Sequence, residues 1–168
     1  MEFRLAQKAD LQQLQSVYRE IVQNMNRQGL TIWDDIYPCE FLGADIEAQR
    51  LFILTNQETI VAAFALCRES AGANALYWKT EGTQPLYLDR LGVNIHYTRQ
   101  GIGSRMLAYA QNVARIWGAD CLRLFVVDSN LAARRLYEKS GLVQATGVYE
   151  EAIDSICTLR EYGYEIIL

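Results

Sequence analysis

The sequence is poor in residues that bind metals. Among its 168 residues there is one histidine, His96, and the four cysteines (Cys39, Cys67, Cys121 and Cys157) form no Cys-x-x-Cys pair. Structural zinc sites draw their ligands from closely spaced Cys and His side chains, so we expect no metal site. Cys67 and Cys121 lie in apolar, strand-like segments, where a buried reduced thiol is the ordinary interpretation. The cysteine pattern therefore favours a reducing, cytoplasmic location.

Basic residues and long apolar runs are also scarce. The chain has 16 Lys and Arg against 20 Asp and Glu, a formal net charge of −4. Non-specific nucleic-acid binding depends on a basic field, so we expect no nucleic-acid partner. No apolar run approaches the roughly 18–20 residues of a membrane-spanning helix. The first residues show no basic segment followed by an apolar run, so we expect neither a secretory signal nor a membrane partner.

Only two prolines occur, and no linker, repeat or low-complexity tract interrupts the chain. This length and continuity predict a single domain over residues 1–168. Helical spacing of apolar residues predicts helices, and alternating or continuous apolar runs predict strands. The predicted strands cover residues 2–6, 51–55, 60–67, 85–93, 121–127, 142–149 and 156–168. The predicted helices cover residues 11–25, 41–50, 102–117 and 130–140.

This order combines a hairpin with a strand–helix–strand crossover. The turn NQET between residues 51–55 and 60–67 is typical of a hairpin, whereas a helix connects residues 85–93 to 121–127, which favours a parallel pair. We therefore predict an α/β (α+β) fold with a mixed, mostly antiparallel sheet of about seven strands flanked by helices. Gly92 inside its strand indicates a bulge or a close backbone approach.

A glycine turn opens the helix that follows residues 85–93. Gly101-Ile102-Gly103 lacks the lysine of a Walker loop, and Met106 stands where a dinucleotide-binding turn needs a small residue. The amides at the start of a helix nevertheless bind anions, and glycines let that backbone approach a ligand. The alternative interpretation is a tight strand-to-helix turn with no ligand.

Two motifs in fixed order narrow this choice. The turn is preceded by Leu91-Gly92-Val93, and Asn130, Ala133, Leu136, Tyr137 and Gly141 follow in Asn-x-x-Ala-x-x-Leu-Tyr-x-x-x-Gly spacing. Residues 87–143 thereby resemble the central motifs of the GCN5-related N-acetyltransferase (GNAT) superfamily, and the predicted element order follows the fold of that family. The resemblance implies an enzyme, an acyltransferase that uses acetyl-CoA as donor, with direct transfer to an amine in a ternary complex.

The resemblance also implies which residues hold the cofactor. The pyrophosphate of coenzyme A would lie on the turn and the pantetheine arm beside the strand, where a backbone N–H near Val93 would polarise the thioester carbonyl. One departure concerns Thr98, which stands where Gln or Arg is usual. We expect Arg99 to supply the missing cation. The implied cofactor-binding residues are Leu91, Gly92, Val93, Thr98, Arg99, Gln100, Gly101, Ile102, Gly103, Ser104, Asn130 and Tyr137.

Three residues of this set of motifs have both a structural and a chemical interpretation. Tyr137 is either a core aromatic or, as the resemblance implies, the proton donor to the departing thiolate. Asn130 is either a helix cap or a cofactor contact. Asp89 would share a strand face with Leu91 and Val93 by alternation and serve as the base for the amine. Alternatively, Asp89 pairs with Arg68 or Arg90 at the surface.

The acceptor is the least determined part of the prediction. The segment between the first helix and the second strand carries Trp33, Asp34 and Tyr37. This mixture of aromatic and acidic groups suits a cationic amine. Alternatively, the segment is a packed lid that does not contact the substrate. The substrate would be a primary amine of a small molecule or a peptide. A GNAT-fold sensor or interaction module that binds acyl-CoA without transfer is the alternative. The closing strands leave a homodimer open, and we expect His96 to lie at the surface.

Overall fold

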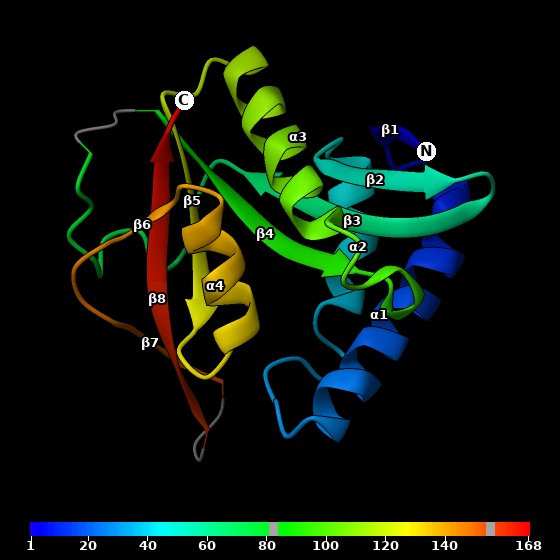
Figure 1. Cartoon of the computed structure of the whole chain (residues 1–168), viewed down its shortest axis with the longest axis horizontal. Helices are drawn as coiled ribbons and strands as arrows, with labels where there is room; N and C mark the ends of the chain where they lie inside the picture. The colour runs from blue at the N-terminus through cyan, green and yellow to red at the C-terminus, as the bar shows by residue number, and fades with distance from the viewer. Residues whose placement is uncertain (81–83, 154–156) are drawn as a thin grey trace. The chain divides into compact units, whose positions relative to one another are not determined.

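The computed structural model describes residues 1–80, 84–153 and 157–168. Within them the strands pair in the order β1-β2-β3-β4-β5-β8-β6, and β7 pairs with the same strand β8 as β6 does. The strands are β1 (Glu2–Leu5), β2 (Leu51–Asn56), β3 (Thr59–Cys67), β4 (Pro85–Val93), β5 (Cys121–Val127), β6 (Val143–Gln144), β7 (Tyr149–Ala152) and β8 (Thr158–Ile167). The helices are α1 (Leu11–Arg27), α2 (Cys39–Glu47), α3 (Ile102–Ile116) and α4 (Leu131–Lys139), with 3₁₀ turns at Lys8–Asp10 and Ile95–Tyr97 (Figure 1).

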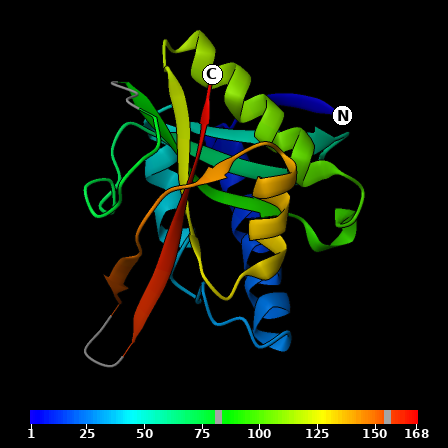
Figure 2. The same cartoon turned by 60° about the vertical axis from the view of Figure 1, so that its left-hand side comes forward.

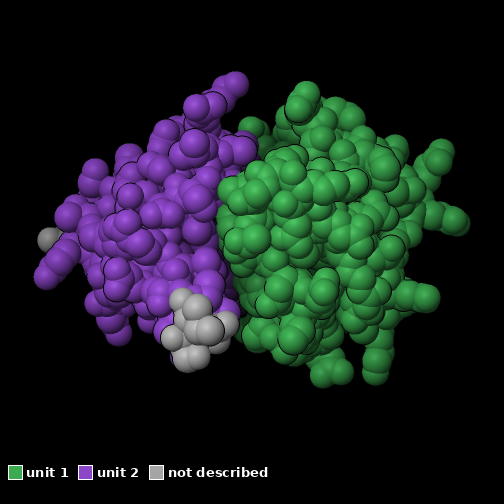
Figure 3. All heavy atoms as spheres, turned by 90° about the horizontal axis from the view of Figure 1, so that it is seen from below, with its two compact units in different colours: residues 1–65, 90–106 green, residues 66–89, 107–168 purple. Residues whose placement is uncertain are grey.

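The chain forms two compact units (Figure 3), one of residues 1–65 and 90–106 and the other of residues 66–89 and 107–168. The first unit contains β1, β2, α1, α2, most of β3 and the end of β4. The second contains the start of β4, the strands β5 to β8, most of α3, and α4.

In the first unit, α1 covers its neighbours with one apolar stripe. Its buried residues recur at i, i+3, i+4, i+7 and i+8 and are Leu14, Val17, Tyr18, Ile21 and Val22, the spacing of one helix face. Full burial of such side chains contributes about 1.5–3 kcal/mol each. The antiparallel hairpin β2–β3 is buried along nearly its whole length. Strands covered on both faces need continuous apolar runs, which explains why both runs were recognisable in the sequence.

In the second unit, β5 is the central strand. Cys121–Arg123 pairs in parallel with Pro85–Tyr87 of β4, and the whole of β5 pairs antiparallel with β8. Figure 2 shows β7 beside β8, where it pairs with residues 158–161, and β6 pairs with Tyr164 and Glu165 of the same strand. The predicted mixed sheet, the parallel pair and the flanking helices are all confirmed.

A buried ion pair fastens the segment before β4 onto this sheet. Glu165 is fully buried, and its carboxylate accepts hydrogen bonds from the backbone N–H of Lys79 and Thr80. Arg123 lies 3.5 Å from the same carboxylate and under the Trp78 ring. The packing is tight, because a Cβ on Gly163 would lie 2.8 Å from that ring. These contacts fix residues 76–80 over β5 and β8.

Two predicted elements differ in detail. Residues 142–149 were expected to form one strand, but β6 ends at Gln144 and β7 begins at Tyr149. Between them Gly147 has φ +107°, which departs from extended backbone, and the backbone of Thr146 bonds to that of Tyr77. The predicted helix 41–50 runs from Cys39 to Glu47. Ile156, where the last strand was expected to begin, lies outside the described residues.

Candidate active site

The end of β4 is irregular at Arg90, which has φ +54°. A residue with a side chain rarely adopts this conformation, at a cost of about 1–3 kcal/mol. The kink interrupts the regular alternation on which we expected Asp89, Leu91 and Val93 to share one face. The shared face therefore remains a prediction. Beyond the kink, Leu91 and Val93 are half-buried and Gly92 is buried.

The expected close approach at Gly92 is present. A Cβ built on Gly92 would lie 2.9 Å from Cε1 of Tyr18 and 3.1 Å from Cδ1 of Ile21, closer than carbon atoms pack without strain. Only glycine therefore lets α1 lie directly on this strand. The Tyr18 hydroxyl donates to the Arg90 carbonyl at 2.5 Å, and burial raises the pKa of this phenol well above its ordinary value, so it stays a donor.

Arg90 itself is buried and paired. Its Nε lies 2.8 Å from Oδ2 of Asp45 on α2, and its guanidinium lies 5.4 Å from the centre of the Phe41 ring. Arg50 donates from Nε to the other carboxylate oxygen of Asp45 at 2.7 Å. Arg90 was one of the two surface partners considered for Asp89. In the structure it is a buried residue that ties β4 to α2.

The glycine turn has the backbone of an anion site. Arg99 and Gly101 have φ values of +60° and +75°, and α3 begins at Ile102. The first N–H groups of a helix have no intrahelical acceptor, so the amides of Ile102, Gly103 and Ser104 are available to a ligand. The Thr98 hydroxyl donates to the Ile95 carbonyl at 3.0 Å. Its hydrogen is thereby used inside the turn.

The side chains around this turn are exposed. Thr98, Arg99, Gln100 and Ser104 all lie at the surface. Among the described residues no acidic partner of Arg99 is found, so the nearest cation to the turn carries an uncompensated charge. Gln100 contacts the His96 carbonyl at 3.4 Å. His96 is exposed, as expected, and lies 3.4 Å from Glu20.

The loop between α1 and α2 carries the predicted acceptor residues. Trp33 lies 5.8 Å from the Tyr18 ring and 6.2 Å from the Tyr37 ring, measured between ring centres. Tyr37 in turn lies 5.6 Å from Phe41. Oδ1 of Asp34 accepts hydrogen bonds from the N–H groups of Ile36 and Tyr37 at 2.7 and 2.6 Å. The carboxylate therefore shapes this loop, while remaining exposed.

In the second unit, Asn130 and Tyr137 belong to α4. Oδ1 of Asn130 accepts the N–H of Ala133 at 3.2 Å, which makes Asn130 the N-cap of the helix. Tyr137 is buried and packs 5.9 Å from the Tyr164 ring. Burial raises the pKa of its phenol. Tyr137 is therefore protonated at neutral pH, the state that a proton donor requires.

Sequence reasoning named Asp89 but missed two carboxylates of the second unit whose pKa values respond to its charge, Glu151 and Glu161. Burial, together with the charges of Glu151 on β7 and of Asp89, raises the pKa of Glu161 on β8 to about 7. Burial and the charge of Asp89 also raise the pKa of Glu151. Glu161 pairs with Val127 across the sheet. An acidic residue in the middle of a mostly apolar strand was the signal that could have revealed it.

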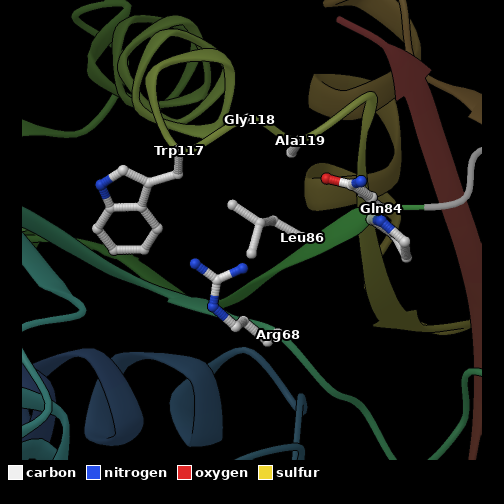
Figure 4. A pocket seen from close by; sticks show the side chains of 7 residues that line it. Arg68, Gln84, Leu86, Trp117, Gly118 and Ala119 are labelled. Carbon is white, nitrogen blue, oxygen red and sulfur yellow. The ribbon is translucent and has the colours of Figure 1, made fainter.

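A separate hollow in the second unit contains none of the predicted site residues. Its volume is about 280 Å³, and Figure 4 shows the guanidinium of Arg68 directed toward the side chains of Trp117 and Leu86. It is formed by the beginning of β4 and the end of α3, whereas the glycine turn precedes α3. This hollow is therefore not part of the candidate active site.

No three metal-binding side chains in residues 1–80, 84–153 and 157–168 are placed to hold an ion. In the same residues no helix has the length and apolar character needed to cross a membrane.

Comparison with known proteins decides the family. The profile of the acetyltransferase (GNAT) family matches residues 14–142, which include most of α1, the irregular end of β4, the glycine turn and Tyr137. The chain belongs to this family. The uncharacterized N-acetyltransferase YhfO of Bacillus subtilis (strain 168) is 31% identical over 110 residues, covering 62% of this chain and 74% of YhfO.

Solved structures show the same GNAT fold. An acetyltransferase of the GNAT family from Streptococcus agalactiae 2603 has a TM-score of 0.82 at 16% identity, over 99% of this chain and 95% of that one. The structure of yncA from Salmonella typhimurium, solved with its cofactor acetyl-CoA, has a TM-score of 0.73 at 17% identity, over 100% and 94%. The resemblance inferred from the two motifs is thereby confirmed.

Proposed function

We propose that the protein is an acetyl-CoA-dependent N-acetyltransferase that acts on a primary amine of a small molecule or a peptide. The main support for this proposal is the backbone of the turn before α3, in a chain that belongs to the GNAT family. It presents the unpaired amides of Ile102, Gly103 and Ser104 beside the exposed cation of Arg99. Such a turn fits a pyrophosphate, because helix N-termini and arginines both bind phosphate oxygens.

The end of β4 fits the remainder of the cofactor. The pairing of β4 with β5 covers Pro85–Tyr87, and we expect the backbone of Leu91–Val93, farther along the strand, to pair with an extended chain. The N–H near Val93 would polarise the thioester carbonyl. Acetyl-CoA, when bound, supplies an activated acetyl group as a thioester. Membership of the GNAT family adds Asn130 and Tyr137 of α4, in the second unit, as further proposed cofactor contacts.

Tyr137 is the proposed proton donor to the departing thiolate. Its phenol is protonated, because burial raises its pKa. Among the described residues its hydroxyl has no hydrogen-bond partner, so it is free to donate to a ligand atom. A phenol with a raised pKa holds its proton until a strong base such as a thiolate forms nearby.

The proposed base is a carboxylate of the group formed by Asp89, Glu151 and Glu161. A cationic amine must lose a proton before it attacks the thioester, and the most effective base has a pKa near the working pH. Glu161, with its pKa of about 7, meets that requirement and is the first candidate, with Asp89, the base expected from the sequence, beside it. Asp89 would then act through its charge, which raises the pKa of Glu161.

The acceptor would approach past the α1–α2 loop. Trp33 and Tyr37 supply aromatic faces there, which attract cations, and Asp34 supplies an exposed carboxylate. These groups favour an amine that arrives protonated. They support a cationic acceptor without selecting between small molecules and peptides.

The test is a binding and turnover measurement on the same samples. Acetyl-CoA should raise the melting temperature, and a thiol-reporter assay with a panel of amines should release coenzyme A. Binding without release from any amine would favour the acyl-CoA sensor over the enzyme. Neither binding nor release would contradict the proposed function altogether.

A further inference from the structure

Leu91–Val93 is anchored at both ends by buried polar side chains. On the side of Arg90, the carbonyl accepts the hydroxyl of Tyr18 at 2.5 Å. On the other side, Asn94 is buried, and its side-chain amide donates to the carbonyl of Ile60 on β3 at 2.9 Å. The backbone N–H of Asn94 donates to the neighbouring Val61 carbonyl at 2.9 Å. The three residues between these anchors are therefore held at fixed points.

The anchor at Arg90 is reinforced by charge. Its guanidinium lies 2.8 Å from Oδ2 of the fully buried Asp45, with a second contact from Nη2 to Oδ1 at 3.3 Å. A two-point contact fixes both position and orientation of the guanidinium. Because both groups are buried, separating them would weaken the compensation of a buried charge. The side chain thus resists rotation of the backbone from which it extends.

The anchors also explain the unusual backbone. Arg90 has φ +54°, a conformation that persists only where the surroundings over-determine it. Tyr18 holds the carbonyl side of this residue and Asp45 holds its side chain. Gly92 lies against the Tyr18 ring, so one residue of α1 both supports the kink and sets the depth of the strand.

We propose that Tyr18, the Asp45–Arg90 pair and Asn94 are positioning residues that hold the backbone of Leu91–Val93 in the geometry required by the thioester. This inference rests on the proposed function, because it assigns the reacting carbonyl to the N–H near Val93. None of these side chains needs to touch the cofactor. A small displacement of a donor aimed at a developing oxyanion lowers the rate strongly.

The sharpest variant is Tyr18→Phe, which keeps the ring against Gly92 and removes the bond to Arg90. Arg90→Met removes the cation at similar length, and Arg90→Lys returns a cation to Asp45. The matched control is Arg123→Met, which breaks the buried Arg123–Glu165 pair of the second unit. All four variants should lose thermal stability, so stability alone does not discriminate among them.

Two readouts separate positioning from mere stability. Tyr18→Phe and Arg90→Met should lower kcat at least tenfold in the folded protein and leave the KM for the amine unchanged, whereas Arg90→Lys restores part of kcat and Arg123→Met retains it. Independently of activity, amide hydrogen exchange at Leu91, Gly92 and Val93 should accelerate at least tenfold in Tyr18→Phe and Arg90→Met and not in Arg123→Met.

The outcomes are distinguishable. Unchanged exchange at Leu91–Val93 in Tyr18→Phe and Arg90→Met overturns the proposal, as does a kcat loss equal to that of Arg123→Met. If the wild-type protein neither binds acetyl-CoA nor releases coenzyme A, the proposed function fails, and a proposal that assigns the thioester to these residues fails with it. If the wild-type protein is active and exchange is unchanged, only the positioning inference fails.

Discussion

The hydroxyl of Tyr18 on α1 donates a 2.5 Å hydrogen bond to the backbone carbonyl of Arg90, the residue at which β4 leaves the extended conformation. The same ring lies where a Cβ on Gly92 would be. Tyr18 therefore supports the kink at Arg90 and leaves no space for a side chain at residue 92. This relationship makes the Leu91–Val93 backbone sensitive to changes that add or remove only one atom.

Gly92→Ala should lower the free energy of unfolding by about 1–3 kcal/mol, the usual cost of inserting an extra carbon into a well-packed core. The added Cβ would lie 2.9 Å from Tyr18. The control is Gly43→Ala in α2, where the Cβ would lie 4.0 Å from Leu11 and alanine gains about 0.5–1 kcal/mol over glycine within a helix. Urea unfolding of both variants gives the comparison. Equal effects of the two substitutions would contradict the packing found at Gly92.

Arg99→Ala should weaken acetyl-CoA binding about fivefold at low salt, because an exposed ion pair contributes up to about 1 kcal/mol. The loss should shrink as salt screens the pair. Arg68→Ala, which removes another exposed arginine from the hollow in the second unit, should leave the affinity unchanged. Titration calorimetry at two salt concentrations measures both. An affinity of Arg99→Ala equal to wild type would remove the assignment of this cation to the pyrophosphate.

Arg99→Gly separates the charge from the backbone strain. The affinity for acetyl-CoA should fall as in Arg99→Ala. The melting temperature should nevertheless exceed that of Arg99→Ala, because φ +60° costs a residue with a Cβ about 1–2 kcal/mol and costs glycine almost nothing. A lower melting temperature than that of Arg99→Ala would show that the turn does not keep this conformation.

Glu161→Gln should stabilise the protein at pH 8 more than at pH 4. The pKa of Glu161 is raised from 4.5 to about 7, so the folded state holds this proton more tightly than the unfolded state does. The resulting penalty is absent below pH 4.5, grows as the pH rises, and is complete above pH 7, where it amounts to about 3 kcal/mol. Thermal melts across this range test it, with Glu150→Gln, an exposed neighbour on β7, as control.

The same variant tests the proposed base. In the wild-type protein kcat/KM should rise with pH through an apparent pKa near 7, because the carboxylate must be ionised to accept the amine proton. Glu161→Gln should remove this rise and lower kcat/KM. If Glu161→Gln is more stable yet keeps the profile, the base lies elsewhere, and Asp89→Asn is the next variant to measure.

Tyr137→Phe should lower kcat by about 10²-fold or more with little loss of stability, because proton donation by a positioned side chain contributes about 10²–10⁴-fold. The comparison is Tyr164→Phe, whose hydroxyl bonds to Glu138 at 2.8 Å and should cost about 1 kcal/mol of stability. Steady-state kinetics and thermal melts of the two variants decide between them. A kcat unchanged by Tyr137→Phe would leave this tyrosine as a core aromatic.

The sequence by itself determined the fold and the family. Its apolar runs 51–55 and 60–67 are buried on both faces of the sheet, and such short continuous apolar runs predict buried strands. The helix of residues 102–116 and the cap at Asn130 were also visible, because local spacing and capping decide where helices begin and end. The spacing between the glycine turn and Tyr137 was sufficient to indicate the GNAT family.

The buried ion pair, the support of the β4 kink and the pKa of Glu161 depend on contacts between residues far apart in the sequence, so only the tertiary structure reveals them. The burial of Arg90 against Asp45 and the bond from Tyr18 join segments 45 and 72 residues apart in the sequence, and no local pattern encodes such pairs. The pKa of Glu161 likewise depends on burial and on charges from β4 and β7. Secondary structure depends mainly on neighbours along the chain, whereas the pKa values of a site and the orientation of its backbone N–H groups depend on neighbours in space.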